Sequence, residues 1–356
     1  MNTIRALMKI SNYAGERFDL VQAGGGNSSV KDDDGTMLIK SSGYLLSEVD
    51  EENGFSKVYT QQIADIVKNQ SILEAEDKRE MEKISTQLVK ESMISQNRTS
   101  IETLLHALML KYTLHTHPLV VNMIVIQKNW KDILTKMFDD IILVDYRTPG
   151  IELALELKKE MDNFESLKHM KAKIFFLQNH GLIITSDNID EIKDLSEEVL
   201  KKIEEYLKID LSRYKETTSI SDLFSCHKEA PCISYLSEDS QINRIFQTNQ
   251  ELLFSLPFCP DKLVYCGIGA VKIAHIEDTN ALKQYVKEYH ELPKIVIFGT
   301  RIYIVAKNIK KAKEIEEMLK FHLLVIENTG QKIHFMDFDE MAYLSNWEAE
   351  QFRQKK

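Results

Sequence analysis

Apolar and polar positions follow two periods along the first part of the chain. Apolar side chains recur at the three- and four-residue spacing of amphipathic helices up to Gly15 and in residues 58–68, 77–95, 101–112, 150–162 and 189–208. Short apolar runs that predict buried strands lie at residues 28–31, 37–41, 119–126, 141–145, 173–178 and 182–185. Helices that alternate with strands in this way predict one α/β layer structure over residues 1–205.

The pattern changes beyond this region. Residues 206–235 are polar, contain Ser and Thr and show little periodicity, so we expect a linker there. Residues 236–356 predict a second, smaller α/β domain, in which 294–309 repeats the order of 173–189: strand, break, strand, Asn-Ile, helix. Two unrelated α/β segments could also show this similarity by convergence. If the second domain is a degenerate repeat, it is metal-free, with Thr300 in the place of His180.

Length, charge and cysteine content narrow the class of protein. The 356 residues exceed one average domain, and 43% hydrophobic residues suffice for packed cores. A net charge of −10 argues against nucleic acid or an anionic membrane as a partner. The sequence has no apolar run near the ~20 residues of a membrane span and no secretory segment at its start, so we expect a cytoplasmic protein. The 4 cysteines form no paired motif and predict free thiols.

Three histidines provide the strongest chemical signal. His115 and His117 are two residues apart, and on a strand such residues point to the same face. A histidine pair alone is more often a packed or surface feature than a metal site. His180, however, lies at a short break between two predicted strands and could complete a set of three imidazoles. Three ligands with one open position are typical of catalytic zinc, whereas structural zinc usually has four.

A carboxylate precedes this histidine pair. Glu102 and His106 are four residues apart on a predicted helix and therefore share one face. Glu102 could act as a general base beside a metal, whose charge also lowers the pKa of nearby groups. The alternatives are an ordinary surface glutamate and, for His106, a packed ring, and for His106 we favour the packed ring.

Two loops are rich in hydrogen-bond donors. Residues 24–29 supply three glycines, an amide and two hydroxyls, and residues 40–43 supply a cation, two hydroxyls and another glycine. A glycine run alone equally marks a tight turn. The two loops together, with Ser100 close to Glu102, predict a pocket for a phosphate or another anion.

Five ordered motifs resemble the class II aldolase/adducin family. They are Gly25-Gly26-Asn27-Ser28-Ser29-Val30-Lys31, Met37-Leu38-Ile39-Lys40-Ser41-Ser42-Gly43, Ser100-Ile101-Glu102, His115-Thr116-His117-Pro118 and Asn179-His180-Gly181-Leu182. The resemblance covers roughly residues 1–205. The family includes zinc-dependent fuculose-phosphate and rhamnulose-phosphate aldolases and ribulose-phosphate 4-epimerases. It implies a three-layer α/β/α domain, followed in this chain by the additional smaller domain.

The resemblance implies roles for the matching residues. His115, His117 and His180 would bind Zn²⁺ or another divalent metal, and Glu102 would be the catalytic acid/base that also touches the metal before substrate arrives. The residues that would hold a substrate phosphate, with Lys40 nearby, are Asn27, Ser42, Gly43 and Ser100. The family also implies a homo-oligomer, commonly a tetramer, that acts on a small sugar or sugar phosphate.

Two departures from the family pattern refine the expected reaction. The phosphate-binding aldolases carry two consecutive serines where this chain has Ser100-Ile101, so one hydroxyl donor is missing. The epimerases carry Asp at the position of Glu102, and the longer side chain favours a carbon–carbon lyase that works through a metal-stabilised enediolate. The alternatives are a sugar-phosphate epimerase, a 3-keto-acid phosphate decarboxylase and a non-catalytic scaffold like the adducins. Three converging imidazoles argue against the scaffold.

Overall fold

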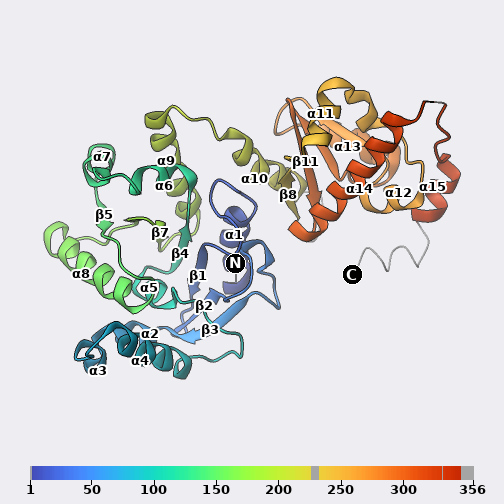
Figure 1. Cartoon of the computed structure of the whole chain (residues 1–356). Coiled ribbons are helices and arrows are strands. Elements are labelled where there is room, and N and C mark those ends of the chain that lie inside the picture. Colours follow the sequence, from blue (N-terminus) through green and yellow to red (C-terminus); the bar gives the residue numbers. More distant parts are fainter. Residues whose placement is uncertain (1, 226–231, 331, 346–356) are drawn as a thin grey trace. The chain divides into compact units, whose positions relative to one another are not determined.

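The chain folds into two compact α/β units, which divide between Leu211 and Ser212 (Figure 1). The computed structural model describes residues 2–225, 232–330 and 332–345. The predicted α/β class is thereby confirmed for both parts of the chain. The described part of 206–235 is not a linker, because it contains helix α10 (Ser212–Ser225) and the start of strand β8 (Ile233–Leu236). Apolar side chains of α10, such as that of Phe224, are buried in the second unit.

A seven-stranded sheet forms the centre of the first unit, in the order β3-β2-β1-β4-β7-β6-β5. Its strands are β1 (Asn27–Lys31), β2 (Thr36–Lys40), β3 (Phe55–Tyr59), β4 (Tyr112–Thr116), β5 (Ile141–Val144), β6 (Ile174–Leu177) and β7 (Gly181–Ser186). Neighbouring strands are antiparallel except β5 and β6, which are parallel. β4 and β7 are central, so their residues are held by strands on both sides.

Helices cover both faces of this sheet and make a three-layer unit. The helices are α1 (Thr3–Gly15), α2 (Thr60–Asp65), α3 (Gln70–Leu73), α4 (Lys78–Glu91), α5 (Thr103–Leu108), α6 (Leu119–Val125), α7 (Trp130–Met137), α8 (Ile151–Lys168) and α9 (Asp190–Leu207), with 3-10 turns at Leu46–Glu48 and Ile66–Lys68. α1, α6 and α9 pack on one face, while α2, α5 and α8 enclose a hydrophobic core on the other. The site described below lies at one end of β4.

Two predicted elements differ in the structure. Residues 119–126, predicted as a strand, form helix α6, whose N-cap is Pro118. Four of its apolar residues, Val120, Val121, Ile124 and Val125, are buried, whereas Met123 is exposed. A short apolar run of this kind does not by itself distinguish a helix from a strand. The helix expected at 101–112 is limited to α5, so Glu102 is the N-cap residue and not part of a helical face.

The second unit has a four-stranded sheet in the order β8-β11-β10-β9. Its further elements are α11 (Ser240–Thr248), a 3-10 turn (Gln250–Phe254), α12 (Pro260–Cys266), β9 (Ala270–Ile273), α13 (Thr279–Tyr289), β10 (Ile295–Phe298), β11 (Arg301–Ala306), α14 (Ile309–Asn328) and α15 (Phe338–Ser345). α10 and α13 contribute to the hydrophobic cluster on one face, and α11, α12 and α14 to the cluster on the other.

The internal similarity seen in the sequence extends to the topology of the two sheets. The order β8-β11-β10-β9 matches β4-β7-β6-β5 strand for strand. The first two pairs are antiparallel and the last pair is parallel in both sheets. The second unit therefore has the architecture expected of a repeat of the half of the first unit that contains β4 to β7.

The second unit buries a lysine whose charge should make its stability depend on pH. Lys262 is 1% exposed and donates hydrogen bonds to the carbonyl oxygens of Gly267 (2.8 Å) and Ile268 (2.7 Å). Burial lowers the pKa of Lys262 to about 8 from the ordinary 10.5. As pH rises, the folded chain therefore releases this proton before the unfolded chain does.

Below about pH 8 the buried charge destabilises the folded state to its full extent, and this destabilisation disappears between about pH 8 and 10.5. Relative to a Lys262→Met variant, the wild-type free energy of unfolding should rise by on the order of 3 kcal/mol across this range. Urea unfolding of the wild type and the variant at about pH 8 and pH 10.5 measures the difference between their free energies of unfolding. A difference that stays constant would contradict the assignment.

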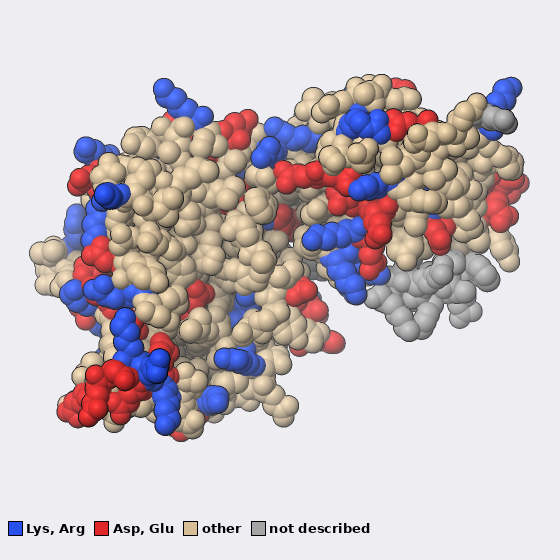
Figure 2. Space-filling view, viewed as in Figure 1, with Lys and Arg blue, Asp and Glu red and all other residues tan. Residues whose placement is uncertain are grey.

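Charges of both signs are interspersed on the face shown in Figure 2. That face therefore lacks the continuous basic surface that nucleic-acid binding uses. Among the described residues, every helix is too short or too polar to cross a membrane.

Candidate metal centre and adjoining cavity

Four side chains from three separate segments converge at the end of β4. His115 is on β4, His117 directly follows that strand, His180 is in the turn between β6 and β7, and Glu102 caps α5. One ligand atom from each lies within 4.8 Å of the others. The Nε2 of His115 is 3.0 Å from that of His117 and 3.2 Å from that of His180. Glu102 Oε1 is 3.1 Å from His115 Nε2 and 3.3 Å from His180 Nε2.

These spacings fit a divalent metal. Nitrogen ligands at ~2.0–2.1 Å from a tetrahedral zinc are ~3.3 Å apart, close to the observed separations. The Nδ1–H of His115 donates to the carbonyl oxygen of Leu182 at 3.0 Å, which leaves a lone pair on Nε2. The 3.1 Å approach of Glu102 Oε1 to this nitrogen needs either a proton on Nε2, which makes the His115 ring positive, or a cation between the two atoms. A divalent cation would supply that charge to all four ligand atoms at once.

Burial and the neighbouring imidazoles set the protonation of the group. Burial, together with the neighbouring His115 and His180, lowers the pKa of His117 to about 3, which favours the neutral ligand form. Burial raises the pKa of Glu102, but the charge of His115 and hydrogen bonds from His115 and His180 outweigh it, and the pKa lies well below its usual range. Glu102 is therefore an ionised carboxylate beside the ring nitrogens of three histidines.

Glycines allow the backbone to approach His117 closely. A Cβ atom on Gly181 would lie 2.3 Å from the carbonyl oxygen of Thr116 and 3.1 Å from the His117 ring. Gly26 has φ +73°, and a Cβ there would lie 2.7 Å from Val21. Part of the glycine-rich segment thus has a steric role beside the metal group, in addition to the anion-binding role expected from the sequence.

A buried ion pair supports the loop that orients His117. The backbone N–H of His117 donates to the carbonyl of Leu20, and that of Leu119 donates to the carbonyl of Asp19, both at 2.9 Å. The side chains of Arg17 and Asp19 are 0% and 1% exposed and form an ion pair, and Arg17 also contacts Glu197 on α9. The pair fixes residues 17–20 and, through their carbonyls, the entry to α6.

Arg17→Met should lower the free energy of unfolding by about 3–5 kcal/mol, because it leaves the Asp19 carboxylate buried without its partner. Urea unfolding measures this loss. The matched control is Arg5→Met: Arg5 pairs with Glu51 at 3.2 Å, but both side chains are exposed, and about 0–1 kcal/mol is expected. Equal losses in the two variants would show that the Arg17 pair has no special role.

His106 does not join the metal group. Its ring is fully buried, and its Nδ1 is 2.7 Å from the Oγ of Ser29. Burial lowers the pKa of His106 to about 3, so the ring is neutral. This placement agrees with the interpretation of His106 as a packed residue.

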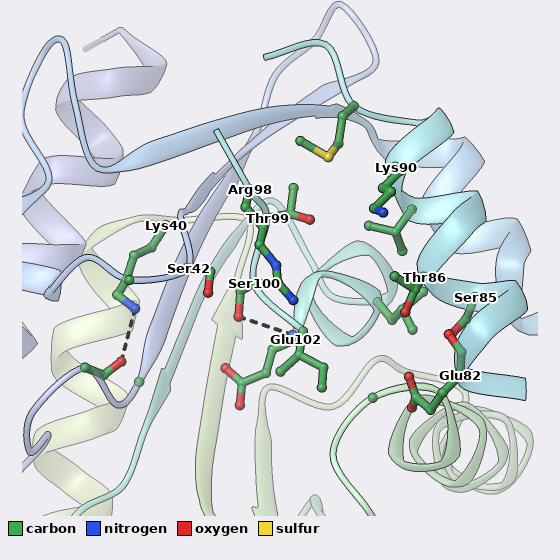
Figure 3. Close-up of a pocket in the computed structure, with 18 of the residues that line it drawn as sticks. Lys40, Ser42, Glu82, Ser85, Thr86, Lys90, Arg98, Thr99, Ser100 and Glu102 are labelled. Carbon is green, nitrogen blue, oxygen red and sulfur yellow. Dashed lines mark hydrogen bonds between the residues drawn. The ribbon is translucent and has the colours of Figure 1, made fainter. Parts of the chain in front are cut away.

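A cavity of about 770 Å³ opens beside the metal group. Glu102 and His117 form part of its wall, and Figure 3 shows the Glu102 carboxylate exposed to it. The volume lies in the range of small-molecule sites. The residues expected from the sequence that line the same cavity are Lys40, Ser42, Gly43 and Ser100.

Asn27 lies beside the metal group and not among the residues that line the cavity. It is paired with His115 across β1 and β4, so the two side chains share a face of the sheet. Its Oδ1 accepts a hydrogen bond from the backbone of Ser28 at 2.8 Å, while its buried Nδ2 has no partner. An unpaired buried donor at this point favours a ligand that would accept its hydrogen bond.

The opposite wall of the cavity was not expected from the sequence. Helix α4 contributes Glu82, Ser85, Thr86 and Lys90, and Arg98 reaches in from the segment before α5 (Figure 3). α4 has the amphipathic pattern of an ordinary surface helix. Only the packing of α4 against α8 shows that its polar residues face the site.

The second unit has different residues where the first has its histidines. Phe175 pairs with Ile183 and Ile183 with His115, and at matching strand positions Val296 pairs with Tyr303 and Tyr303 with Leu236. Leu236 thus takes the place of His115, Glu238 that of His117 and Thr300 that of His180. Within the described ranges, the group around His115 is the one set of His, Cys, Asp and Glu side chains arranged to hold a metal.

Comparisons with known proteins show the family of the first unit. Residues 5–207 match the family model described as class II aldolase and adducin N-terminal domain. No curated protein matches the chain. Among solved structures, the N-terminal class II aldolase domain of a Thermoplasma acidophilum protein is 26% identical, with a TM-score of 0.48, and the match covers 58% of this chain and 94% of that one.

Two further solved structures are similar over the same share of this chain. An L-fuculose 1-phosphate aldolase is 17% identical, with a TM-score of 0.40, and the match covers 58% of this chain and 84% of that one. A sugar-phosphate aldolase from Thermotoga maritima is 16% identical, also with a TM-score of 0.40, and the match covers 58% and 94%.

Proposed function

Because the chain belongs to the class II aldolase and adducin family, we propose that it is a zinc-dependent aldolase that cleaves or forms a carbon–carbon bond in a sugar phosphate or related hydroxy-ketone. The observation that carries the proposal is the convergence of Glu102, His115, His117 and His180 at the wall of a ligand-sized cavity. Zn²⁺, or another divalent metal, would be held by the three imidazoles. A cytoplasmic homo-oligomer, tetrameric as is common in the family, is part of the same proposal.

The residues of the site have separable tasks in this reaction. A divalent cation, when bound, supplies Lewis-acid stabilisation of negative charge that develops on the oxygens of the substrate. Glu102, ionised and facing the cavity, accepts or returns the proton that moves as the carbon–carbon bond breaks or forms. Lys40 donates to the carbonyl of Gly24 at 3.2 Å and lies with Ser42, Gly43 and Ser100 where an anionic end of the substrate would bind.

Product identification tests this proposal. The zinc-loaded full chain is incubated with a panel of ketose phosphates and the corresponding unphosphorylated ketoses, and the products are identified. We expect release of an aldehyde together with a shorter ketone fragment. An epimer as the product would show an epimerase instead of an aldolase, and carbon dioxide would show a decarboxylase. A chain that binds zinc but converts none of the panel would support a scaffold.

A further inference from the structure

The segment before Glu102 runs beside the end of β2 as a short antiparallel ribbon. Ser41 is bridged to Thr99, and the backbone N–H of Ser42 donates to the carbonyl oxygen of Arg98 at 3.0 Å. Side chains alternate between the two faces of such a ribbon. Ser41 and Thr99 are buried on one face, where the Oγ of Ser41 is 2.6 Å from that of Ser56.

The other face of this ribbon is directed into the cavity. By the same alternation it carries Lys40, Ser42, Arg98 and Ser100, and all four line the cavity. Figure 3 shows the Arg98 side chain extending into the cavity toward Ser100 and Glu102. Three of these residues are the expected anion-binding groups, so Arg98 completes one continuous polar surface with them.

The charges of the cavity wall are unevenly matched. Glu102 is engaged by His115 and His180, and Glu82 accepts the backbone N–H of Ile151 at 2.9 Å, at the start of α8. Within the described part of the chain, no ion pair joins Arg98 or Lys90 to a carboxylate. Lys40, Lys90 and Arg98 outnumber the two wall carboxylates, so the formal charge of the wall is positive, which favours an anionic ligand.

The neighbouring residue explains why a guanidinium is needed here. Ile101 lines the cavity with 59% of its surface exposed, and it stands where the phosphate-binding aldolases carry the second of two serines. An isoleucine donates no hydrogen bond. Arg98 offers a planar fork of donors that suits the oxygens of a phosphate or carboxylate.

We propose that Arg98 is a substrate-binding residue that, with Ser42 and Ser100, binds the phosphate of the substrate and replaces the hydroxyl donor lost at Ile101. The inference rests on the proposed function and deepens it, because it selects phosphorylated substrates over neutral ones. Arg98 acts in binding and not in proton transfer. Its removal should therefore raise KM for a phosphorylated ketose far more than it lowers kcat.

The test uses the zinc-loaded full chain with inorganic phosphate as the probe, and isothermal titration calorimetry gives the dissociation constant. Arg98→Gln should weaken phosphate binding about ten- to hundredfold, the usual range for hydrogen bonds to charged groups. Arg98→Lys keeps the charge without the fork of donors, so its dissociation constant for phosphate should lie between those of the wild type and Arg98→Gln. The matched control is Arg79→Gln, which makes the same charge change on an exposed part of α4 outside the cavity and should bind like the wild type.

Zinc content and thermal unfolding are measured for each variant, and Arg98→Lys decides the outcome if Arg98→Gln does not fold. Unchanged phosphate affinity in Arg98→Gln, or no phosphate binding by the wild type, would overturn the inference. The binding measurement needs no turnover. A chain that binds phosphate through Arg98 yet cleaves no ketose would disprove the proposed reaction and leave the anion site standing.

Discussion

Replacement of His115 by alanine is expected to abolish both metal retention and activity. His115 lies at the centre of the group, with its Nε2 within 3.2 Å of the nitrogens of His117 and His180 and of the Glu102 carboxylate oxygen. Loss of a ligand with a fixed ring removes both a metal bond and the geometry of the others. A metal contribution of several kcal/mol corresponds to a fall in kcat/KM of at least about a thousandfold.

Elemental analysis of the purified variant and an aldehyde-release assay measure the two effects. The matched control is His334→Ala, because His334 is exposed in the second unit and lies outside the metal group. It should keep the metal and the activity of the wild type. A His115→Ala protein that is active without bound metal would falsify the assignment of the site.

Glu102→Gln is expected to separate metal binding from chemistry. The amide keeps the size of the side chain but cannot accept the proton, so kcat should fall about 10²–10⁴-fold. The three imidazoles remain, and zinc should still bind. The fall in kcat is measured at saturating substrate together with zinc content. A matched variant, Glu82→Gln, changes a carboxylate that lines the same cavity but caps α8, and it should leave kcat much closer to that of the wild type.

Activity of Glu102→Gln within a few-fold of the wild type would exclude Glu102 as the acid/base. Loss of zinc from this variant would instead assign Glu102 to the metal itself. This second outcome is a real alternative, because Glu102 Oε1 lies 3.1 Å from the Nε2 of His115, close enough to share a metal with it.

The convergence of the three histidines could be predicted from the sequence because it follows from where the strands end. His115 is on a strand, and His180 is in the turn of the adjoining hairpin, so the pairing of β4 with β7 brings them together. The prediction was less accurate for His117, which lies beyond the end of β4. Its position depends on the turn into α6 and on the loop that Arg17 fixes.

The opposite wall of the cavity could not be predicted, because tertiary packing alone determines it. Nothing in the sequence of α4 distinguishes Lys90 from the other polar residues of a surface helix. Arg98 is recognised only once the bridge between Ser41 and Thr99 sets the register of its segment against β2. The strand predicted at 119–126 was wrong because a short apolar run does not show whether its period is that of a helix or of a strand.

The second unit repeats the strand arrangement of the first without the candidate metal ligands. Its sheet has the order and strand directions of β4, β7, β6 and β5, yet Leu236 and Thr300 occupy the places of His115 and His180. Neither side chain is a zinc ligand of the kind found in proteins. Among the described residues, the proposed site is therefore the one place where we expect a catalytic metal to bind.

Reconstitution with metal tests the central claim most directly. The full chain is stripped of metal with a chelator, zinc is added back in small steps, and aldehyde release from a cleaved ketose phosphate is followed at each step. The proposed site predicts that activity is lost on stripping, returns in proportion to added zinc and reaches its plateau at one zinc per chain. Activity that survives complete metal removal, or that needs a second zinc per chain, would contradict it.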